Sequence, residues 1–553
     1  MSKLVIFDLG GVVATTPVYT IQQFAWEKGV PSQLLQKLFL PSDEMHPMFQ
    51  LEVGIISLSQ FYKLADELVL KLADEEGIKL HKDFSIEGLF KKIPKSLNAV
   101  PEMLNASAAL REKGIKTCIL TNNWTDDTET GLLVSNLMRL RYYFDDVFES
   151  CKLGLRKPDG EAFKVVCEKM GANINEAIVL DDLPNNLKPA KELGMTTIQV
   201  KDPFSALKTL KEITGVDVFA PHPVSPCSPN EVPHCFVTLK TGIKMHYVDV
   251  GQGPAVILLH GFPEFWYIWK YQIPALALAG FRVIAPDLRG YGQTTSPSEI
   301  VAYGRENLSK DIISLLDCLL LPQVTVVGHD WGGVIAWDLA IHYSDRVRAI
   351  ANMTPYQPPN PTVNPLKALQ AKPGVFQYQL YFHKEGEAEK EFESDLRKTF
   401  IYMLRYSTDQ LMGGELSTAN VLERGGIFKG FPENVEKSPM ITEQDLDYFV
   451  ESFTKTGFRG ALNWYRNTER NWLWSLKVVG RKIQQPSLMI TCGQDQVISP
   501  ALSAHMKDWA VKLSQVHIEE SSHWTPLDCP LKLNNILIDW MKKIKDGADT
   551  SKL

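Results

Sequence analysis

The sequence predicts an α/β protein of two domains joined by a linker, and three observations support this. A chain of 553 residues is too long for one hydrophobic core. Residues 217–233 form a polar run without regular periodicity, which contains Pro221, Pro223, Pro226, Pro229 and Pro233. Proline at this density blocks helix formation and favours extended geometry. On both sides of the run, short apolar segments are followed by polar, mostly acidic residues. Short apolar segments of this length are typical of buried strands. We therefore expect one domain over residues 1–216, a semi-rigid linker, and a second domain over residues 234–548.

Composition and charge exclude several classes of protein. The formal net charge is −7 and basic residues do not cluster, which argues against a nucleic-acid partner. The eight cysteines form no Cys-x-x-Cys pair, and Asp8 interrupts the first apolar run, so we expect neither a disulfide framework nor a signal peptide. No stretch approaches the roughly 20 apolar residues that a membrane-spanning helix needs. We expect a soluble protein that works in a reducing compartment.

In the first half, polar residues follow four predicted strands. Residues 3–7, 118–120, 151–155 and 178–180 lead, respectively, to Asp8, to Thr121-Asn122, to Lys157-Pro158 and to Asp181-Asp182. Open α/β sheets bind ligands at the carboxyl ends of their strands. We therefore expect a nucleophilic carboxylate, a hydroxyl and an amide that hold phosphate, a lysine that neutralises charge, and acids that hold Mg²⁺.

This set resembles the haloacid-dehalogenase superfamily, most members of which are phosphatases. The resemblance implies a Rossmann-like sheet with a helical cap and a phosphate site made of Asp8, Thr121, Asn122 and Lys157. It also implies Mg²⁺ held by Asp8, the carbonyl of Gly10 and Asp182. The superfamily's phosphatases usually carry Asp-x-Asp, in which the second aspartate is the general acid and base. Here the segment is Asp8-Leu9-Gly10, so we expect phosphatase turnover to be weak or lost.

In the second half, Gly328-His329-Asp330-Trp331-Gly332 carries the strongest chemical signal. An apolar segment, 324–327, precedes it as a strand would, and residues 333–337 follow as an opening helix. This is the pattern of a nucleophile elbow, in which glycines permit the tight turn that exposes the central residue. That residue is Asp330, where serine is more common. A carboxylate nucleophile suits displacement at a saturated carbon and gives an alkyl ester on the enzyme.

The partners that an elbow needs follow in the chain order of α/β-hydrolases. Residues 487–491 predict a late strand, with Asp495 just after it and His523 further on. We expect Asp495 to orient His523, which would activate water against the ester. Upstream, residues 256–259 lead into His260-Gly261-Phe262-Pro263, and the amides of Phe262 and Trp331 are expected to form an oxyanion hole.

Residues 357–480 interrupt the alternation of strands and helices with amphipathic stretches such as 387–406 and 443–456. We expect them to form a helical cap inserted over the active site. Six tyrosines fall in this segment, and their spacing does not single out any of them for a catalytic role: Tyr378, Tyr381, Tyr402, Tyr406, Tyr448 and Tyr465.

Taken together, the two halves and the linker resemble the vertebrate-type bifunctional soluble epoxide hydrolases over nearly the whole chain. The resemblance implies that Tyr378 and Tyr465 hydrogen-bond the epoxide oxygen, and that Gln379 belongs to the substrate site. It further implies lipophilic epoxides, both fatty-acid and aromatic, as substrates, vicinal diols as products, no cofactor for this reaction, and a homodimer. A haloalkane dehalogenase is one alternative, although its halide needs N–H donors rather than paired phenols. A lipid-phosphate phosphatase as the main activity is another, and Gly10 argues against it.

The last three residues are Ser551-Lys552-Leu553, a peroxisomal address read by an import receptor. The polar residues before them favour access by that receptor. We expect residues 549–553 to act as a targeting tail, with the protein in the peroxisome and the cytoplasm.

Overall fold

The computed structural model describes residues 3–39, 41, 43–81, 83–93, 97, 99–127, 140, 143–219, 226–406 and 418–545. The chain divides into two compact units, the first formed mainly by residues 1–224 and the second by most of residues 225–553. The division falls within the proline-rich run. Pro221, Pro223 and the tail Ser551-Lys552-Leu553 lie outside the described residues.

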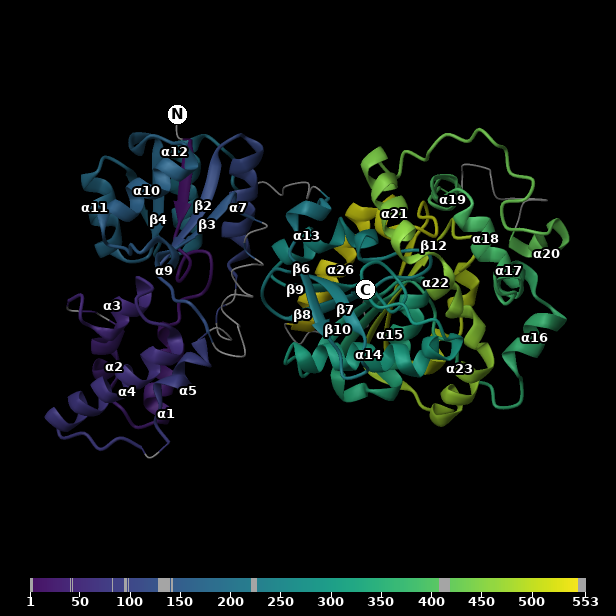
Figure 1. The fold of residues 1–553 in the computed structure, drawn as a ribbon, viewed down its shortest axis with the longest axis horizontal. Helices are drawn as coiled ribbons and strands as arrows, with labels where there is room; N and C mark the ends of the chain where they lie inside the picture. Colours follow the sequence, from purple (N-terminus) through teal and green to yellow (C-terminus); the bar gives the residue numbers. More distant parts are fainter. Residues whose placement is uncertain are drawn as a thin grey trace. The chain divides into compact units, whose positions relative to one another are not determined.

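The first unit contains a five-stranded parallel sheet in the order β3-β2-β1-β4-β5 (Figure 1). Its strands are β1 (Leu4–Phe7), β2 (Lys116–Thr121), β3 (Asp146–Glu149), β4 (Ala177–Asp181) and β5 (Thr196–Gln199). All four residues of β1 are buried, as expected for a central parallel strand covered on both faces. Helices accompany the sheet: α7 (Pro101–Glu112), α9 (Ser150–Leu153), α10 (Gly160–Met170), α11 (Pro184–Glu192) and α12 (Pro203–Thr214).

A separate helical group lies between β1 and α7 in the chain and forms the cap of this unit (Figure 1). It comprises α1 (Val18–Glu27), α2 (Ser32–Phe39), α3 (Pro47–Glu52), α4 (Leu58–Glu75) and α5 (Ile86–Phe90). The sequence of α4 explains why this cap helix packs on one face. Its buried residues are spaced three or four apart and so lie on the same side: Leu58, Phe61, Ala65, Val69 and Ala73. Ser57 is the N-cap residue that precedes this helix, and its backbone N–H donates to Gln60 Oε1 at 2.9 Å.

One predicted strand is wrong. Residues 151–155 do not form a strand that ends at Lys157, because the strand is β3 and the chain then turns through α9. Gly154, with φ at +69°, ends this short helix, and Lys157 lies in the loop that follows. The apolar residues of this short segment face the core from a helical turn, which periodicity alone does not distinguish from a strand.

The second unit contains an eight-stranded sheet in the order β13-β12-β11-β10-β8-β9-β7-β6. The strands are β6 (His234–Thr238), β7 (Lys244–Val250), β8 (Ala255–Leu259), β9 (Arg282–Pro286), β10 (Val324–Gly328), β11 (Val347–Asn352), β12 (Ile483–Cys492) and β13 (Ala510–Ile518). Strand β7 pairs antiparallel with β6 and β9, and the remaining pairs are parallel. Helices α13 (Gln272–Leu278), α14 (Arg305–Cys318), α15 (Asp330–His342) and α26 (Pro530–Lys545) flank the sheet (Figure 1).

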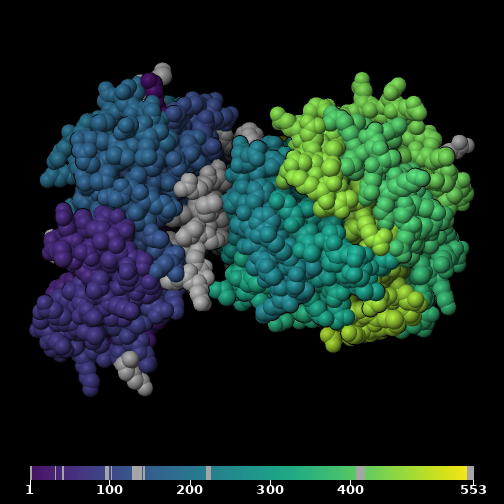
Figure 2. Space-filling model, in the orientation of Figure 1, coloured from purple at the N-terminus to yellow at the C-terminus, as the bar shows by residue number. Residues whose placement is uncertain are grey.

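The helical cap lies between β11 and β12 in the chain, close to the predicted residues 357–480. The α-helices described in it are α16 (Pro365–Ala371), α17 (Gln377–Phe382), α18 (Glu387–Glu393), α19 (Leu396–Met403), α20 (Val421–Arg424), α21 (Glu443–Thr456), α22 (Arg459–Asn463) and α23 (Thr468–Ser475). In the space-filling view these segments, in shades of green, gather on one side of the second unit (Figure 2). Among the described residues, no helix is long and apolar enough to cross a bilayer.

The cap is anchored to the sheet domain by a buried ion pair. Lys270 Nζ lies 2.6 Å from Asp445 Oδ2, and Tyr267 donates its hydroxyl to Asp445 Oδ1 at 2.8 Å. Asp445 stands in the first turn of α21, so these bonds hold the start of a cap helix against the segment that follows β8. The anchoring helps to define the cavity between the cap and the carboxyl ends of the strands.

Candidate active site

Asp330 sits on the sharp turn between β10 and α15. Its φ is +48°, a left-handed backbone conformation that costs energy for a residue with a side chain. The neighbouring glycines make the turn possible, since a Cβ at Gly332 would lie 2.1 Å from the Leu259 carbonyl oxygen. A Cβ at Gly261 would lie 2.4 Å from the Asp330 side chain. The sequence therefore lifts one carboxylate above the sheet and lets the backbone of a second loop approach it.

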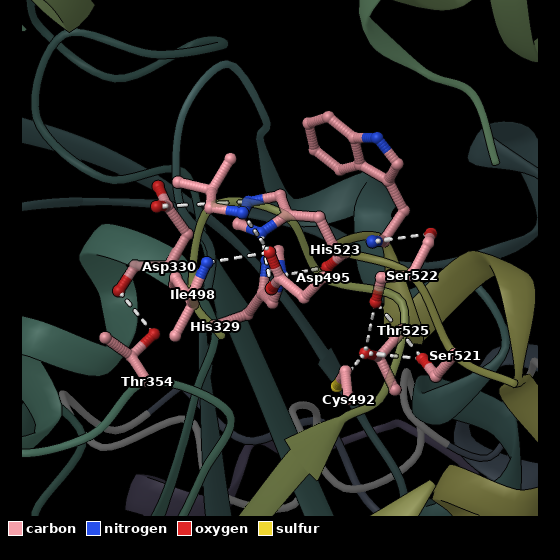
Figure 3. Close-up of polar contacts among 12 residues, drawn as sticks. His329, Asp330, Thr354, Cys492, Asp495, Ile498, Ser521, Ser522, His523 and Thr525 are labelled. Carbon is pink, nitrogen blue, oxygen red and sulfur yellow. Dashed lines mark hydrogen bonds and ion pairs between the residues drawn. The ribbon is translucent and has the colours of Figure 1, made fainter. Parts of the chain in front are cut away.

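That second loop supplies a hydrogen bond to the nucleophile. The backbone N–H of Phe262 donates to Asp330 Oδ1 at 2.8 Å. Thr354 Oγ1 donates to the Asp330 carbonyl oxygen at 3.0 Å and steadies the turn (Figure 3). Trp331 follows in the first turn of α15, where backbone N–H groups have no partner within the helix. The amide of Phe262 therefore contacts the carboxylate from its loop, and the amide of Trp331 follows the nucleophile at the start of α15.

His523 stands between two carboxylates. Its Nδ1 donates to Asp495 Oδ2 at 2.9 Å, and its Nε2 lies 4.0 Å from Asp330 Oδ2 (Figure 3). Asp495 follows β12 and is itself held by the backbone N–H groups of Val497 and Ile498, both at 2.8 Å. The fold thus brings together the three residues that the sequence places in the order nucleophile, acid and histidine.

The charges at this site are strongly coupled. Burial alone would lower the pKa of His523, but Asp495 and Asp330 raise that pKa to about 9. Burial raises the pKa of Asp330, and the nearby His523 and His329 oppose that rise. Burial would also raise the pKa of Asp495, yet His523 and two backbone N–H groups hold it below its usual range. Both carboxylates therefore favour the protonated form of His523.

Tyr378 and Tyr465 reach the same cavity from the cap. Tyr378 lies on α17 and Tyr465 in the 3-10 helix Tyr465–Asn467, with ring centroids 6.0 Å apart. Both line the cavity that also contains Asp330 and His523. Burial raises the pKa of both phenols, so they remain protonated and able to donate. Gln379 Nε2 donates to the Tyr378 hydroxyl at 3.4 Å, which places Gln379 beside the pair.

The other four tyrosines differ in their surroundings. Tyr381 and Tyr448 do not line this cavity, and Tyr448 accepts a hydrogen bond from Trp266 Nε1 at 3.2 Å. Tyr402 and Tyr406 do line it, although Tyr402 donates its hydroxyl to the Pro432 carbonyl at 2.5 Å. Apolar side chains make up much of the remaining wall: Phe262, Phe382, Met403, Ile427, Val497 and Trp524. The wall favours lipophilic ligands.

The first unit assembles its own polar site at the carboxyl ends of β1, β2 and β4. Lys157 is buried and its Nζ lies 2.6 Å from Asp8 Oδ1 and 2.7 Å from Asp181 Oδ2. Asn122 holds the lysine loop in place, because its Nδ2 donates to the Lys157 carbonyl and its Oδ1 accepts from the Lys157 N–H, both at 2.8 Å. Thr121 is buried at the end of β2.

The residues present fit a divalent cation. Carboxylate oxygens of Asp8, Asp181 and Asp182 lie within 4.8 Å of one another, and oxygen ligands are those that Mg²⁺ prefers. Burial raises the pKa of Asp8 to about 7, with Lys157 opposing the rise and Asp181 and Asp182 adding to it. The sequence indicated the Asp181-Asp182 pair as acids for Mg²⁺, and the set implied by the resemblance kept only Asp182. The structure places both carboxylates near Asp8. Gly10 supplies no side chain beside Asp8.

Comparisons with known proteins agree with the two sites. A family model described as alpha/beta hydrolase fold matches residues 254–530, and one described as haloacid dehalogenase-like hydrolase matches residues 2–194. The chain is 43% identical to "Bifunctional epoxide hydrolase 2" of Rattus norvegicus, with 100% of both chains covered. It is 42% identical to the protein of the same name from Sus scrofa, over 98% of this chain and 97% of the relative.

Shorter proteins match a little more than half of this chain. "Epoxide hydrolase A" of Mycobacterium tuberculosis is 35% identical over 54% of this chain and 94% of its own length. A crystal structure of an epoxide hydrolase from Vigna radiata is 32% identical, with a TM-score of 0.51, and covers 57% of this chain and 99% of its own. The two relatives named above that cover nearly the whole chain are both named bifunctional epoxide hydrolases.

Proposed function

The chain belongs to the bifunctional epoxide hydrolase family, as its likeness to full-length relatives shows, and from this premise we propose that its Asp330 site converts epoxides to vicinal diols. One observation carries the proposal: a carboxylate nucleophile, a histidine and two protonated phenols line one largely apolar cavity, and Asp495 holds that histidine by a hydrogen bond. Each of these groups is needed for a different part of the reaction.

In the first step, a carboxylate oxygen of Asp330 attacks a ring carbon of the epoxide. A C–O bond of the ring breaks, and its electron pair stays on the epoxide oxygen as a developing alkoxide. Tyr378 and Tyr465 hydrogen-bond that oxygen, and one of them gives it a proton. The product of this step is an alkyl ester on Asp330 that carries a hydroxyl on the adjacent carbon.

Before the second step, His523 loses its proton, and the tyrosine that donated in the first step regains one. The neutral Nε2 of His523 then removes a proton from water, and the resulting hydroxide attacks the ester carbonyl of Asp330. The backbone N–H of Phe262, with that of Trp331, stabilises the negative charge on the carbonyl oxygen. The C–O bond between the carbonyl carbon and the alkoxy oxygen breaks, His523 returns the proton to that oxygen, and the diol leaves. The proton left on the Asp330 carboxyl then passes to His523, which restores the nucleophilic carboxylate. Asp495 keeps Nδ1 protonated and the imidazole in place.

The apolar wall supports lipophilic epoxides, fatty-acid and aromatic, as the substrate class. Haloalkane dehalogenation is the competing reaction on this fold. The paired phenols disfavour it, because they can protonate an alkoxide, whereas a departing halide needs only N–H donors. Full-length relatives named as epoxide hydrolases also support epoxide opening.

We propose a second, weak activity for the first unit, the Mg²⁺-dependent hydrolysis of lipid phosphates. Asp8 would be the nucleophile, Thr121 and Asn122 would bind phosphate, and Lys157 would neutralise charge. Asp8, Asp182 and the Gly10 carbonyl would hold Mg²⁺, which supplies charge neutralisation at the phosphate. Gly10 offers no general acid, and this supports slow turnover.

The remaining proposals concern assembly and location. We propose a homodimer, which is what the resemblance to the family implies. Ser551-Lys552-Leu553 supports our proposal that the peroxisomal import receptor recognises the chain, with a cytoplasmic pool.

A direct comparison of the two activities on the purified protein tests the assignment. We expect diol formation from a lipophilic epoxide to be abolished by Asp330→Ala and unaffected by Asp8→Ala. Release of phosphate from a lipid phosphate in the presence of Mg²⁺ should be much slower and should respond only to Asp8→Ala. Efficient phosphate release without diol formation would contradict the proposed main function.

A further inference from the structure

The polar site of the first unit contains groups that can receive a phosphoryl group, but its Gly10 offers no group to remove it. We propose that Asp8 accepts a phosphoryl group from acyl phosphates and retains it as a phospho-aspartate. The inference rests on the proposed phosphate site of the first unit and names the class of donor that this site takes. It is independent of epoxide hydrolysis at Asp330.

Asp8 is open to a donor. Its side chain is 12% exposed, whereas those of Lys157 and Asp181 are 3% and 0% exposed. Asp181 is also held on both carboxylate oxygens by Asn186 Nδ2, at 3.0 and 3.1 Å. A nucleophilic oxygen has to be accessible to the donor. Asp8 is therefore the member of the Asp8–Lys157–Asp181 contact that can attack phosphorus.

Positive and polar groups around Asp8 can hold phosphoryl oxygens. Lys157 Nζ lies 2.6 Å from Asp8 Oδ1 and so stands beside the atoms that would carry the phosphoryl group. The Thr121 hydroxyl lies 3.5 Å from the Asn122 carbonyl oxygen, a distance at which a hydrogen bond is weak, so this hydroxyl can turn to a phosphoryl oxygen. The three aspartates of the site fit Mg²⁺, which supplies charge neutralisation when bound.

Gly10 restricts the leaving group of the transfer. A bond forms between a carboxylate oxygen of Asp8 and phosphorus, and the bond between phosphorus and the leaving oxygen breaks, with its electron pair kept by that oxygen. An alkyl phosphate would release an alkoxide, a strong base that needs a proton as it leaves. An acyl phosphate releases a carboxylate, which is stable without a proton at neutral pH. A site without a general acid therefore favours acyl phosphates.

The energy of the product favours the same donors. Phospho-aspartate is itself a mixed anhydride of a carboxylic and a phosphoric acid. Transfer from an acyl phosphate exchanges one such anhydride for another, so the bonds made and broken are of similar energy. Transfer from an alkyl phosphate replaces an ester by an anhydride and is unfavourable. A phosphoryl group should therefore accumulate on Asp8 from acyl phosphates and not from alkyl phosphates.

Removal of the phosphoryl group should be slow. Hydrolysis of a phospho-aspartate is fast when a base takes a proton from the attacking water, and Gly10 provides none. The cap brings one other carboxylate, Glu52, to the segment that carries Lys157. Glu52 is engaged in an ion pair, because its Oε2 lies 2.5 Å from Arg156 Nε and both side chains are largely buried. We therefore expect the phosphoryl group to remain on Asp8 after the donor is removed.

Intact-protein mass spectrometry of the full-length chain tests this. After incubation with acetyl phosphate and Mg²⁺ and removal of both, the protein should carry one added phosphoryl group, sensitive to hydroxylamine, on the peptide that contains Asp8. Asp8→Asn should not gain it. Asp202→Asn is the matched control, since it removes an exposed carboxylate that caps α12, and it should gain the group as the unmodified protein does.

The lifetime of the adduct tests the role of Gly10. Gly10→Asp should lose the phosphoryl group roughly 10²–10⁴-fold faster than the unmodified protein, and Gly10→Ala should not. Equal lifetimes in Gly10→Asp and the unmodified protein would overturn the inference. So would rapid loss from the unmodified protein that slows in Glu52→Gln, because Glu52 would then be the base.

A comparison of donors tests the restriction on the leaving group. With 4-nitrophenyl phosphate, whose leaving group is also a weak base, the unmodified protein should release an initial burst of one nitrophenolate per chain, followed by a much slower phase. Glycerol phosphate should leave no adduct on the protein. Phosphorylation of Asp8 to the same extent by glycerol phosphate and acetyl phosphate would contradict the assignment of acyl phosphates as donors.

Beryllium trifluoride, which mimics a phosphoryl group on a carboxylate, separates failure of the inference from failure of the site. Fluorine NMR should show it bound to the unmodified protein with Mg²⁺ and not to Asp8→Asn. Bound beryllium trifluoride without a retained phosphoryl group would overturn the inference and leave the proposed phosphate site intact. If neither beryllium trifluoride nor a phosphoryl group binds, the proposed phosphate site is wrong and the inference falls with it.

Discussion

The Nε2 atom of His523 lies 4.0 Å from Asp330 Oδ2, while its Nδ1 lies 2.9 Å from Asp495 Oδ2. This placement couples the base of the second step to the nucleophile of the first. In the resting enzyme the two carboxylates outweigh burial and raise the pKa of His523 to about 9. Esterification of Asp330 removes one of those negative charges. His523 should therefore lose its proton more easily once the ester has formed, when a base is needed.

The pH dependence of ester breakdown follows from this relationship. Only neutral His523 can accept a proton from water, so breakdown should slow as the pH falls through the pKa of His523 in the ester. That pKa should lie below the resting value of about 9, because the charge of Asp330 is gone. Single-turnover measurement of diol release across a pH series checks this. A breakdown rate that increases toward acid pH would contradict the role of His523.

Because Tyr378 and Tyr465 both donate to the epoxide oxygen, we expect each to compensate in part for loss of the other. Tyr378→Phe or Tyr465→Phe alone should leave measurable hydrolysis, with each donor worth about 10²-fold in rate. The double substitution should abolish it, because no donor remains for the alkoxide. Tyr402→Phe is a matched control, since Tyr402 lines the same cavity but donates to the Pro432 carbonyl. Full activity in the double variant would place the proton donor elsewhere in the cap.

We expect phosphatase activity to increase when Gly10 is replaced by aspartate. A Cβ at Gly10 would meet only Pro17 Cδ, at 3.6 Å, so the position has room for a side chain. Gly10→Asp should raise Mg²⁺-dependent turnover by roughly 10²–10⁴-fold, the usual contribution of a general acid and base. Gly10→Ala should not. Robust phosphatase activity in the unmodified chain, abolished by Asp8→Ala, would show that another group supplies the proton.

We expect the C-terminal tripeptide to direct the protein to peroxisomes. Removal of Ser551-Lys552-Leu553 should shift a fluorescently tagged protein, with the tag placed at the amino terminus, from peroxisomes to the cytosol. Diol formation by the purified truncated protein should be unchanged, because the active site does not include these residues. If the intact chain never co-localises with a peroxisomal marker, the tripeptide is not read as an address.

Much of the second unit could be predicted because its signals are local. Strand 324–327 and the helix after it are confirmed as β10 and α15, and their glycines are needed to keep the turn free of clashes. The chain order of Asp330, Asp495 and His523 could also be predicted, since each follows a strand. The two-domain α/β fold is confirmed by both family models.

What the sequence could not settle depends on contacts between distant segments. The choice of Tyr378 and Tyr465 among six tyrosines needs the cap folded over the sheet, because α17 and Tyr465 meet only in three dimensions. The ion pair of Glu264 with His329 joins two loops, although both residues flank motifs that were recognised. Short segments such as 151–155 remain ambiguous, because one turn of helix and a short buried strand show similar apolar patterns.

The covalent ester on Asp330 is the central claim, and intact-protein mass spectrometry of His523→Gln tests it most directly. Without a base, attack by Asp330 should proceed while hydrolysis stalls, so the protein should gain the mass of one substrate molecule. Proteolysis should locate the added mass on the peptide that contains Asp330, and Asp330→Asn/His523→Gln should show no adduct. A properly folded His523→Gln protein that consumes no epoxide and carries no adduct, or carries it on another peptide, would contradict the mechanism.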